Sequence, residues 1–356
     1  MLIGIPRKGR AAALNTPNPF ESLHIEVDPQ CAEEHGLSTE TQFFSDASKS
    51  ILSRNSSPDL FFDFSINPYR GCEHGCIYCY ARPTHEYLGF SAGVDFESKI
   101  LVKTNAPELL AAAFSRPSWK PQVICFSGNT DPYQPVERKL EITRQCLDVF
   151  RKYGNPVGLI TKNYLVTRDI DILSELAANN LVTVTISITS LRDDLIGEME
   201  PRTSRPSRRL RAIEMLSSAG IPVGVNVAPV IPGLTDEEMP EILKAARDAG
   251  ATFANYLIMR LPGNVEQIFL EWLNRTNPMR AARVTNRIKQ IRDGKMSDSR
   301  FGSRHRGEGE WAAIIKKVYN LQMDKLLLQP GPPELRTDLF CDPQSTLQQD
   351  LFGKEA

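Results

Sequence analysis

The chain has 356 residues, of which 41% are hydrophobic and 24% are charged, and its formal net charge is −1 at pH 7. This is an ordinary globular composition, long enough for one large domain with extensions or for two smaller domains. No run of about 18 apolar residues occurs, which excludes a membrane-spanning helix, and residues 1–20 lack the apolar stretch of a signal peptide. We therefore expect a cytoplasmic protein with no membrane partner, in which clustered cysteines suggest metal binding or catalysis before disulfides.

The predicted elements begin only after a long N-terminal stretch. Residues 1–60 have weak periodicity and scattered Pro, Ser and Asn, so we expect a partly ordered N-terminal extension. Strand patterns then alternate with helical patterns. The expected strands are 61–67, 122–128, 156–162, 182–189, 222–231 and 251–261, and the expected helices between the later ones are 140–154, 169–180, 207–220 and 237–250. Such alternation implies parallel strands joined by crossover helices, with one core over residues 61–261.

The part of the chain beyond residue 261 reads differently. Residues 262–328 form a helical C-terminal segment, with helices expected at 265–273, 281–294 and 310–323. Residues 329–356 are rich in Pro and Gln, and we expect a disordered tail there. The loop FGSRHRGEGEWA (301–312) is either a lid over the active face or a plain connection.

The strand at 182–189 indicates which face of the sheet is covered. Valine and isoleucine alternate strictly with threonine and serine over VTVTISIT, and 222–228 shows a similar alternation with small residues. A strand buried under helices on both faces would be apolar on both sides. One small, polar face is typical of an open barrel whose lumen holds a polar ligand, although a wet face between domains would look the same. The fold class is therefore α/β, with a partial (βα)6, TIM-like barrel favoured.

Charge is unevenly distributed along the chain. Residues 21–63 hold nine Asp and Glu against two Lys and Arg, whereas residues 278–306 hold nine Lys and Arg against two Asp. These segments are solvated faces, pack on each other, or form a basic surface for an anionic substrate. A group of five arginines around the start of the helix expected at 207–220 could add phosphate contacts: Arg202, Arg205, Arg208, Arg209 and Arg211. No groove-reading motif accompanies them, so nucleic acid stays one open substrate class among others.

Three of the seven cysteines lie in the stretch GCEHGCIYCYAR (71–82), directly after the first strand. Cys72, Cys76 and Cys79 have the spacing C-x3-C-x2-C, and three thiolates cannot complete a tetrahedral zinc site. His74 or His85 could supply a fourth ligand, so a Cys3His zinc site is conceivable. A cubane cluster on the same three cysteines would instead leave one iron free for a substrate or cofactor.

The cysteine spacing, the aromatic residue before Cys79 and the six-fold βα pattern together resemble the radical S-adenosylmethionine (SAM) superfamily, over roughly residues 61–261. The resemblance implies a [4Fe–4S] cluster on Cys72, Cys76 and Cys79 and SAM on the remaining iron. It also implies reductive cleavage to a 5′-deoxyadenosyl radical that abstracts hydrogen from a substrate, with an electron-donating partner such as flavodoxin or ferredoxin. The residues carried over as SAM contacts are Tyr78, Thr130, Asp131, Lys162, Ser187 and Asn226.

Each SAM contact has an ordinary structural alternative. Tyr78 corresponds to the family's aromatic against the adenine, or it packs in the loop. Thr130 and Asp131 lie in SGNTDPYQP (127–135), where the family meets the SAM amino group, but T-D-P also makes a turn. Lys162 could pair with the SAM carboxylate or lie on the surface, while Ser187 and Asn226 could bond the cofactor or each satisfy an internal hydrogen bond.

Within the superfamily, CIYCY and EPRTSRPSRRLRAIEMLSSAGIPVGVNVAPVIPG (200–233) resemble the spore photoproduct lyase-like branch, and NPYRGCEHGCIYCYARPTHEYLG resembles a bacterial sub-branch without a settled substrate. That branch implies a DNA-repair lyase as an alternative function. Its hydrogen-donating cysteine, however, corresponds here to Gly128 or Asn129, with Cys125 a few residues earlier. The catalytic residues beyond the cofactor site are therefore not identified. A zinc- or iron–sulfur-binding module without enzymatic activity is the other alternative.

Overall fold

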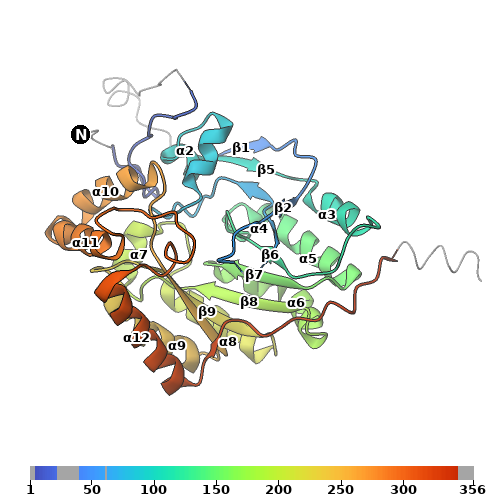
Figure 1. Cartoon of the computed structure of the whole chain (residues 1–356). Coiled ribbons are helices and arrows are strands. Elements are labelled where there is room, and N and C mark those ends of the chain that lie inside the picture. The colour runs from blue at the N-terminus through green and yellow to red at the C-terminus, as the bar shows by residue number, and fades with distance from the viewer. Residues whose placement is uncertain (1–4, 22–39, 61, 344–356) are drawn as a thin grey trace, which may run out of the picture.

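The computed structural model describes residues 5–21, 40–60 and 62–343. Its main sheet has the strand order β11-β10-β9-β8-β7-β6-β3-β2 (Figure 1). The strands are β2 (Leu52–Arg54), β3 (Phe64–Ile66), β6 (Ile124–Phe126), β7 (Val157–Thr161), β8 (Val182–Ser187), β9 (Val223–Val230), β10 (Phe253–Ile258) and β11 (Gln329–Pro330). From β3 to β10 every neighbouring pair is parallel, and β2 runs antiparallel to β3 at one edge. The predicted α/β fold with six parallel strands is confirmed, and the described sheet is open, with β2 and β11 at its two edges.

Helices connect successive parallel strands and cover one face of the sheet. They are α3 (Ala106–Phe114), α4 (Glu137–Leu140), α5 (Ile142–Tyr153), α6 (Ile170–Ala178), α7 (Asp193–Met199), α8 (Pro206–Ser218) and α9 (Met239–Asp248). In β8 the side chains of Val182, Val184 and Ile186 belong to the main apolar core beneath these helices. The alternating threonines and Ser187 therefore occupy the opposite, inner face, because successive side chains of a strand point to opposite sides.

A second, smaller sheet supports the cysteine loop, and sequence patterns did not predict it. Its order is β1-β5-β4, with β1 (Gln42–Ser45) parallel and β4 (Tyr69–Arg70) antiparallel to β5 (Lys99–Val102). The 3₁₀ helix η1 (Arg82–Leu88) and the short helix α2 (Val94–Ser98) precede β5. The cysteine loop thus leaves the end of β4 and is packed against a scaffold built from the segment that follows it.

The C-terminal segment consists of α10 (Val265–Thr276), α11 (Pro278–Ile291) and α12 (Gly309–Leu326). Between α11 and α12, residues 298–306 form what we call the strap. At one end, the Ile258 N–H at the end of β10 donates to the carbonyl of His305 at 2.9 Å. The same part of the strap also contacts Asp59, to which the Gly302 N–H donates at 2.8 Å and with which Arg304 forms an ion pair at 2.7 Å. Because Asp59 lies in the β2–β3 hairpin loop, the strap joins the two edges of the open sheet.

Residues 329–343 cross the opposite end of the sheet (Figure 1). After β11 pairs with the start of β10, the Arg336 N–H donates to Asn180 at 3.0 Å and the Cys341 N–H to Tyr153 at 3.0 Å. The Phe340 ring packs 6.0 Å from that of Phe114. We expected no fixed structure from residue 329 onward; up to residue 343 the chain instead packs on the loops that precede the strands, because its few apolar side chains meet an apolar surface there. Residues 344–356, and residues 1–4 and 22–39 of the expected N-terminal extension, lie outside the described residues.

In the described part of the chain, no helix is both long and apolar enough to cross a membrane.

Candidate functional site

The three cysteines occupy one tight loop directly after β4. Gly71 and Gly75 have φ angles of +78° and +66°, which L side chains rarely adopt. A Cβ on Gly75 would lie 2.8 Å from the Glu97 carboxylate. Cys72 and Cys76 are buried and Cys79 is half-buried, and the Cys72 N–H donates to the carbonyl of Phe96 at 2.9 Å. The loop is therefore shaped largely by its backbone, so the cysteine side chains are not needed to hold it and can serve as ligands.

Arg82 stabilises this loop through hydrogen bonds. Its buried guanidinium donates to the carbonyls of Gly75 and Cys76, both within 3.1 Å, and to the Glu97 carboxylate at 2.5 Å. Two further bonds, of 3.0 and 2.9 Å, reach the carbonyls of Ala92 and Gly93. A planar guanidinium with five donors can satisfy several carbonyls of one turn at once. Neither Arg82 nor Glu97 was singled out in the sequence, because nothing in the local pattern marks them.

The two histidines near the cysteines have other partners. The ring of His74 lies between Asp131, at 3.4 Å, and the Asn163 amide, at 3.1 Å. Burial lowers the pKa of His74, but the charge of Asp131 outweighs this and raises the pKa to about 10. His85 contacts the carbonyl of Lys99 at 2.9 Å, and burial lowers its pKa to about 4. Both side chains thus stabilise the scaffold.

A mononuclear zinc site would need a fourth ligand close to the sulfurs. Within the described ranges, no three His, Cys, Asp or Glu side chains converge on the position of a single metal ion. A cluster makes a different demand, since cysteine thiolates bind separate iron atoms of one cubane. The arrangement of donors therefore fits a cluster better than a Cys3His zinc ion.

Two of the predicted cofactor residues link the loops around the cysteines. The Asp131 carboxylate accepts from the Thr161 hydroxyl and the Lys162 N–H, both at 2.7 Å. Burial raises the pKa of Asp131, but the charge of His74 and the hydrogen bonds to the carboxylate outweigh burial. The net pKa is lowered, so the carboxylate is ionised. The Thr130 hydroxyl donates to the carbonyl of Tyr69 at 2.9 Å. Asp131 and Thr130 therefore tie the loop after β6 to β7 and to β4, and their contact with SAM stays a prediction.

The structure brings Tyr78 and Lys162 together around Glu200, which the sequence analysis did not identify. The Tyr78 hydroxyl donates to the Glu200 carboxylate and lies 3.1 Å from the hydroxyl of Thr189. The Lys162 Nζ lies 3.6 Å from Glu200 and 5.7 Å from the centre of the Tyr78 ring. Although burial raises its pKa, the charges of Arg209 and Lys162 lower the pKa of Glu200 well below its usual range.

Ser187 and Asn226 are direct neighbours on the inner face, paired in the register of β8 and β9. Both are buried, and Asn226 Oδ1 is a buried acceptor without a hydrogen-bond partner in the described structure. Leaving such an atom unpaired costs about 1–3 kcal/mol, so its retention points to a ligand group that it binds. This orphaned acceptor fits a polar cofactor on the inner face, beside the cysteine loop.

Burial also determines whether the cysteine thiols are protonated. It raises the pKa of Cys79 to about 11 and that of Cys76 well above its usual range, with the charge of Glu200 adding to the effect at Cys76. Without metal these thiols are protonated at neutral pH. Iron–sulfur ligation requires thiolates, so cluster binding would release these protons.

The position expected of the repair lyase's hydrogen donor carries no cysteine. Gly128, with φ of +105°, and Asn129 form the loop after β6. Cys125 lies within β6, fully buried, and burial raises its pKa to about 12. A buried thiol in the middle of a strand is commonplace, and it does not replace a donor in that loop.

The five arginines near α8 all have partners within the protein. Arg202 pairs with Glu73 at 3.0 Å, Arg211 pairs with Glu214 at 2.7 Å, and Arg205 donates to the carbonyl of Asp193 at 2.5 Å. Arg208 stacks on the ring of Tyr164 and the buried Arg209 pairs with Glu200. The charge that suggested phosphate contacts is thus largely used within the fold.

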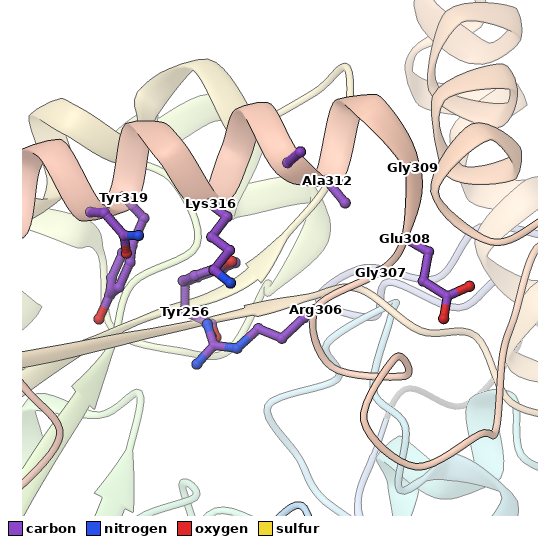
Figure 2. A pocket seen from close by; sticks show the side chains of 10 residues that line it. Tyr256, Arg306, Gly307, Glu308, Gly309, Ala312, Lys316 and Tyr319 are labelled. Carbon is purple, nitrogen blue, oxygen red and sulfur yellow. The ribbon is translucent and has the colours of Figure 1, made fainter.

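A surface pocket of about 440 Å³ lies between β10 and α12 (Figure 2). Its lining includes Tyr256, Arg306, Glu308, Lys316 and Tyr319. None of the cysteines or predicted SAM contacts lines this pocket. It belongs to the outer side of β10, apart from the cysteine loop.

Comparison with known proteins adds the family context. A family model described as the radical SAM superfamily matches residues 66–246. An uncharacterised protein of Mycobacterium bovis is 37% identical over 283 residues, which cover 79% of this chain and 80% of the relative. A radical SAM Nα-GlyT isomerase of Pseudomonas phage M6 is 24% identical over 48% of this chain and 34% of the isomerase.

Solved structures of spore photoproduct lyase share the fold. The lyase complexed with dinucleoside spore photoproduct superposes with a TM-score of 0.59 at 17% identity, covering 80% of this chain and 79% of the lyase. A lyase variant with bound AdoMet and dinucleoside spore photoproduct has a TM-score of 0.59 at 16% identity, over 86% and 85% of the two chains. At this level of identity the likeness concerns the architecture alone.

Proposed function

This chain belongs to the radical SAM superfamily, and on that premise we propose that it is an enzyme that binds a [4Fe–4S] cluster and SAM and abstracts a hydrogen atom from a substrate. The observation that supports the proposal is the buried cysteine loop beside an inner face with an unpaired acceptor. When bound, the cluster would supply the electron that cleaves SAM to methionine and a 5′-deoxyadenosyl radical. An external electron donor such as flavodoxin or ferredoxin is part of the proposal.

The roles of the chain's own residues follow from their positions. Cys72, Cys76 and Cys79 would hold the cluster, and the Arg82 guanidinium keeps their turn in shape whether or not metal is present. Asn226 and Ser187 would bind polar groups of SAM on the inner face. Burial of the loop excludes water from the reacting centre, which protects a reactive species from side reactions.

Tyr78 and Lys162 would form the wall between the cluster and the inner face. Glu200 fixes the Tyr78 ring through its hydroxyl, and the same carboxylate neutralises Lys162. The Lys162 Nζ also donates to the Ala228 carbonyl at 2.9 Å, which ties the end of β7 to β9. These contacts hold the wall rigid, as a site that must position a radical requires.

The first prediction tests the cysteines. Replacing Cys72, Cys76 and Cys79 together by Ala should abolish iron binding, because the cluster would lose all three of its expected thiolate ligands. Anaerobic reconstitution should give about four irons per wild-type chain by order of magnitude, the composition of one cubane, and background iron in the variant. The reduced wild-type protein should release 5′-deoxyadenosine from SAM, and the variant should not.

Cys341→Ser is the matched control, since Cys341 is exposed and distant in sequence from the loop. It should retain both iron and SAM cleavage. A full cluster spectrum in the triple variant, or one zinc and no iron in the wild type, would contradict the proposal.

A further inference from the structure

A cationic site lies next to the cysteine loop, where the end of β10 meets Tyr80. Tyr80 directly follows Cys79, and its side chain is 44% exposed although its neighbours in the loop are buried. Its hydroxyl donates to the carbonyl of Gly128, and the guanidinium carbon of Arg260 lies 5.0 Å from the ring centre. Arg260 comes just after β10, so opposite sides of the half-barrel meet at this ring.

Arg260 has no counterion. Among the residues that the structure describes, its guanidinium forms no hydrogen bond and no ion pair, and the Tyr80 ring is its one recorded partner. Burial and the charge of Arg304 lower the pKa of Arg260, while Tyr80 and Asp59 act in the opposite direction. Its N–H donors are therefore not used by the described protein groups and are available to an anion.

His305, on the strap, is held beside the end of β10, because its carbonyl accepts from the N–H of Ile258, two residues before Arg260. Its ring makes no hydrogen bond within the described structure, whereas its backbone carbonyl is bonded to Ile258. Burial, together with the charges of Arg260 and Arg304, lowers the pKa of His305 to about 4. At neutral pH the ring is therefore uncharged and can donate one N–H.

The neighbouring cations are already engaged. Arg304 pairs with Asp59, and Arg306 donates to Asn255 at 2.7 Å while stacking 4.1 Å over the Tyr256 ring (Figure 2). The buried Arg292 donates to three carbonyls, those of Ile258, Met259 and Ser303. The Asp59 carboxylate also accepts a hydrogen bond from the Gly302 N–H of the strap. Buried Nε atoms of Arg292 and Arg304 lack a hydrogen-bond partner in the described structure, but both guanidiniums are held by the contacts above, whereas the side chains of Arg260 and His305 form no hydrogen bond there.

We propose that Arg260 and His305 bind an oxyanion of the substrate, a phosphate or a carboxylate group, over the face of Tyr80. That this anion belongs to a substrate rests on the function proposed above. A guanidinium fork matches two oxygens of such a group, and a neutral imidazole N–H would reach a third. Apart from Tyr78, the predicted SAM contacts lie on the loop after β6, at the end of β7 and on β8 and β9. Arg260 follows β10 and His305 lies on the strap, so we assign these two side chains to the substrate.

Equilibrium anion binding tests the proposal without turnover. The reconstituted protein with an oxidised cluster and saturating SAM is titrated calorimetrically with inorganic phosphate and, separately, with acetate, in a buffer free of other oxyanions. We expect saturable binding of one of the two anions, and the preferred one distinguishes phosphate from carboxylate. Arg260→Gln and His305→Phe should each weaken it about tenfold or more, the loss expected for a charge-assisted hydrogen bond of about 1.4 kcal/mol or more.

Arg280→Gln is the matched control, since Arg280 is an exposed arginine of α11. This substitution also removes one positive charge, but at a different place in the chain, and it should leave the affinity for the anion unchanged. Arg260→Lys keeps the charge but loses the fork, and should bind with intermediate affinity. Iron content and circular dichroism equal to wild type establish that each variant is folded.

Three results would overturn the proposal: no saturable binding of either anion, equal affinity in Arg260→Gln, or competition between the anion and SAM. The last would assign the site to the cofactor's own carboxylate. These outcomes are independent of the proposed function, which fails on a different measurement, namely no release of 5′-deoxyadenosine by the reduced wild-type protein.

Discussion

At the scale of single residues, the side chains that shape the cysteine loop differ from those that could bind ligands. Arg82 donates to four carbonyls and a carboxylate, all of them within the fold, and it has no capacity left. Among the described residues, Asn226 Oδ1 and the guanidinium of Arg260 form no hydrogen bond and could still accept or donate one. Whether all hydrogen-bonding groups of a side chain are used thus distinguishes scaffold residues from candidate binding residues, although Arg82, Asn226 and Arg260 all lie around the same inner space.

Asn226 gives a test that separates a binding role from a structural one. Asn226→Leu removes an unpaired buried acceptor, so the free energy of unfolding of the cluster-free protein should stay the same or rise by about 1 kcal/mol. SAM affinity of the reconstituted protein should fall about tenfold or more, corresponding to about 1.4 kcal/mol. Denaturant titration and equilibrium dialysis with labelled SAM measure the two quantities.

Thr183→Val is the control for this change, because Thr183 is a buried polar residue on the same face of β8. It should leave SAM affinity unaltered. If Asn226→Leu bound SAM as tightly as wild type, the unpaired acceptor would not be a cofactor contact.

At the scale of elements, the strap depends on a few polar contacts. Burial raises the pKa of Asp59, but the Gly302 N–H and the Arg304 charge lower it below its ordinary value of 3.8. The depressed pKa means that the stabilising contribution of Asp59 is present above pH 3.8 and is lost as the pH falls through the lower, folded value. The strap should therefore remain attached at neutral pH.

Asp59→Asn should loosen the strap without unfolding the sheet, because it removes the charge that holds Arg304. We expect hydrogen exchange of the amides of residues 300–306 to accelerate at least several-fold, while that of β8 and β9 is unchanged. Mass spectrometry after peptic digestion resolves the two regions. Asp193→Asn, an exposed carboxylate at the start of α7, is the control. Uniform acceleration over the whole chain would instead mean that Asp59 supports global stability.

The elements also show what the sequence could and could not predict. The six parallel strands were predicted because Val and Ile alternate with small polar residues, as over Val182–Ser187. The strands β1 and β4 have four and two residues, too few to show a period, and so the smaller sheet was missed. The cysteines were found because their spacing is local.

The partners of charged residues were the least predictable part of the site. Arg209 was read as a phosphate contact, whereas its buried ion pair with Glu200 depends on how the chain folds between them. Arg260 and His305 lie 45 positions apart, and only the strap brings them together. A sequence shows that a charge exists, but long-range packing decides whether it is neutralised or left for a ligand.

At the scale of the whole molecule, residues 329–343 fasten one end of the sheet. Leu335 is buried, and the Phe340 ring lies between those of Phe114 and Tyr153. The backbone carbonyl of Leu339 lies so close to Gly154 that a Cβ there would approach it to 2.3 Å. This segment therefore behaves as part of the core domain.

Ending the chain after Leu328 should lower the free energy of unfolding by about 3 kcal/mol, the value expected for exposing one or two large apolar side chains. Ending it after Pro343 is the control, since it keeps every one of these contacts and should leave the stability unchanged. Thermal or denaturant unfolding of the two truncated proteins measures the difference. Equal stabilities would show that the packing of residues 329–343 contributes nothing.

The strap has a consequence for how large a molecule could reach the inner face. Residues 298–306 connect the β2–β3 hairpin loop to the end of β10, so the chain itself encloses the open side of the half-barrel. A substrate therefore cannot enter sideways between the sheet edges. We expect access along the axis instead, past the exposed side chain of Tyr80. A continuous polymer could not slide through such a ring, so any polymeric substrate would have to offer either a terminus or a single unit swung out of its strand, as enzymes that act on extruded bases require.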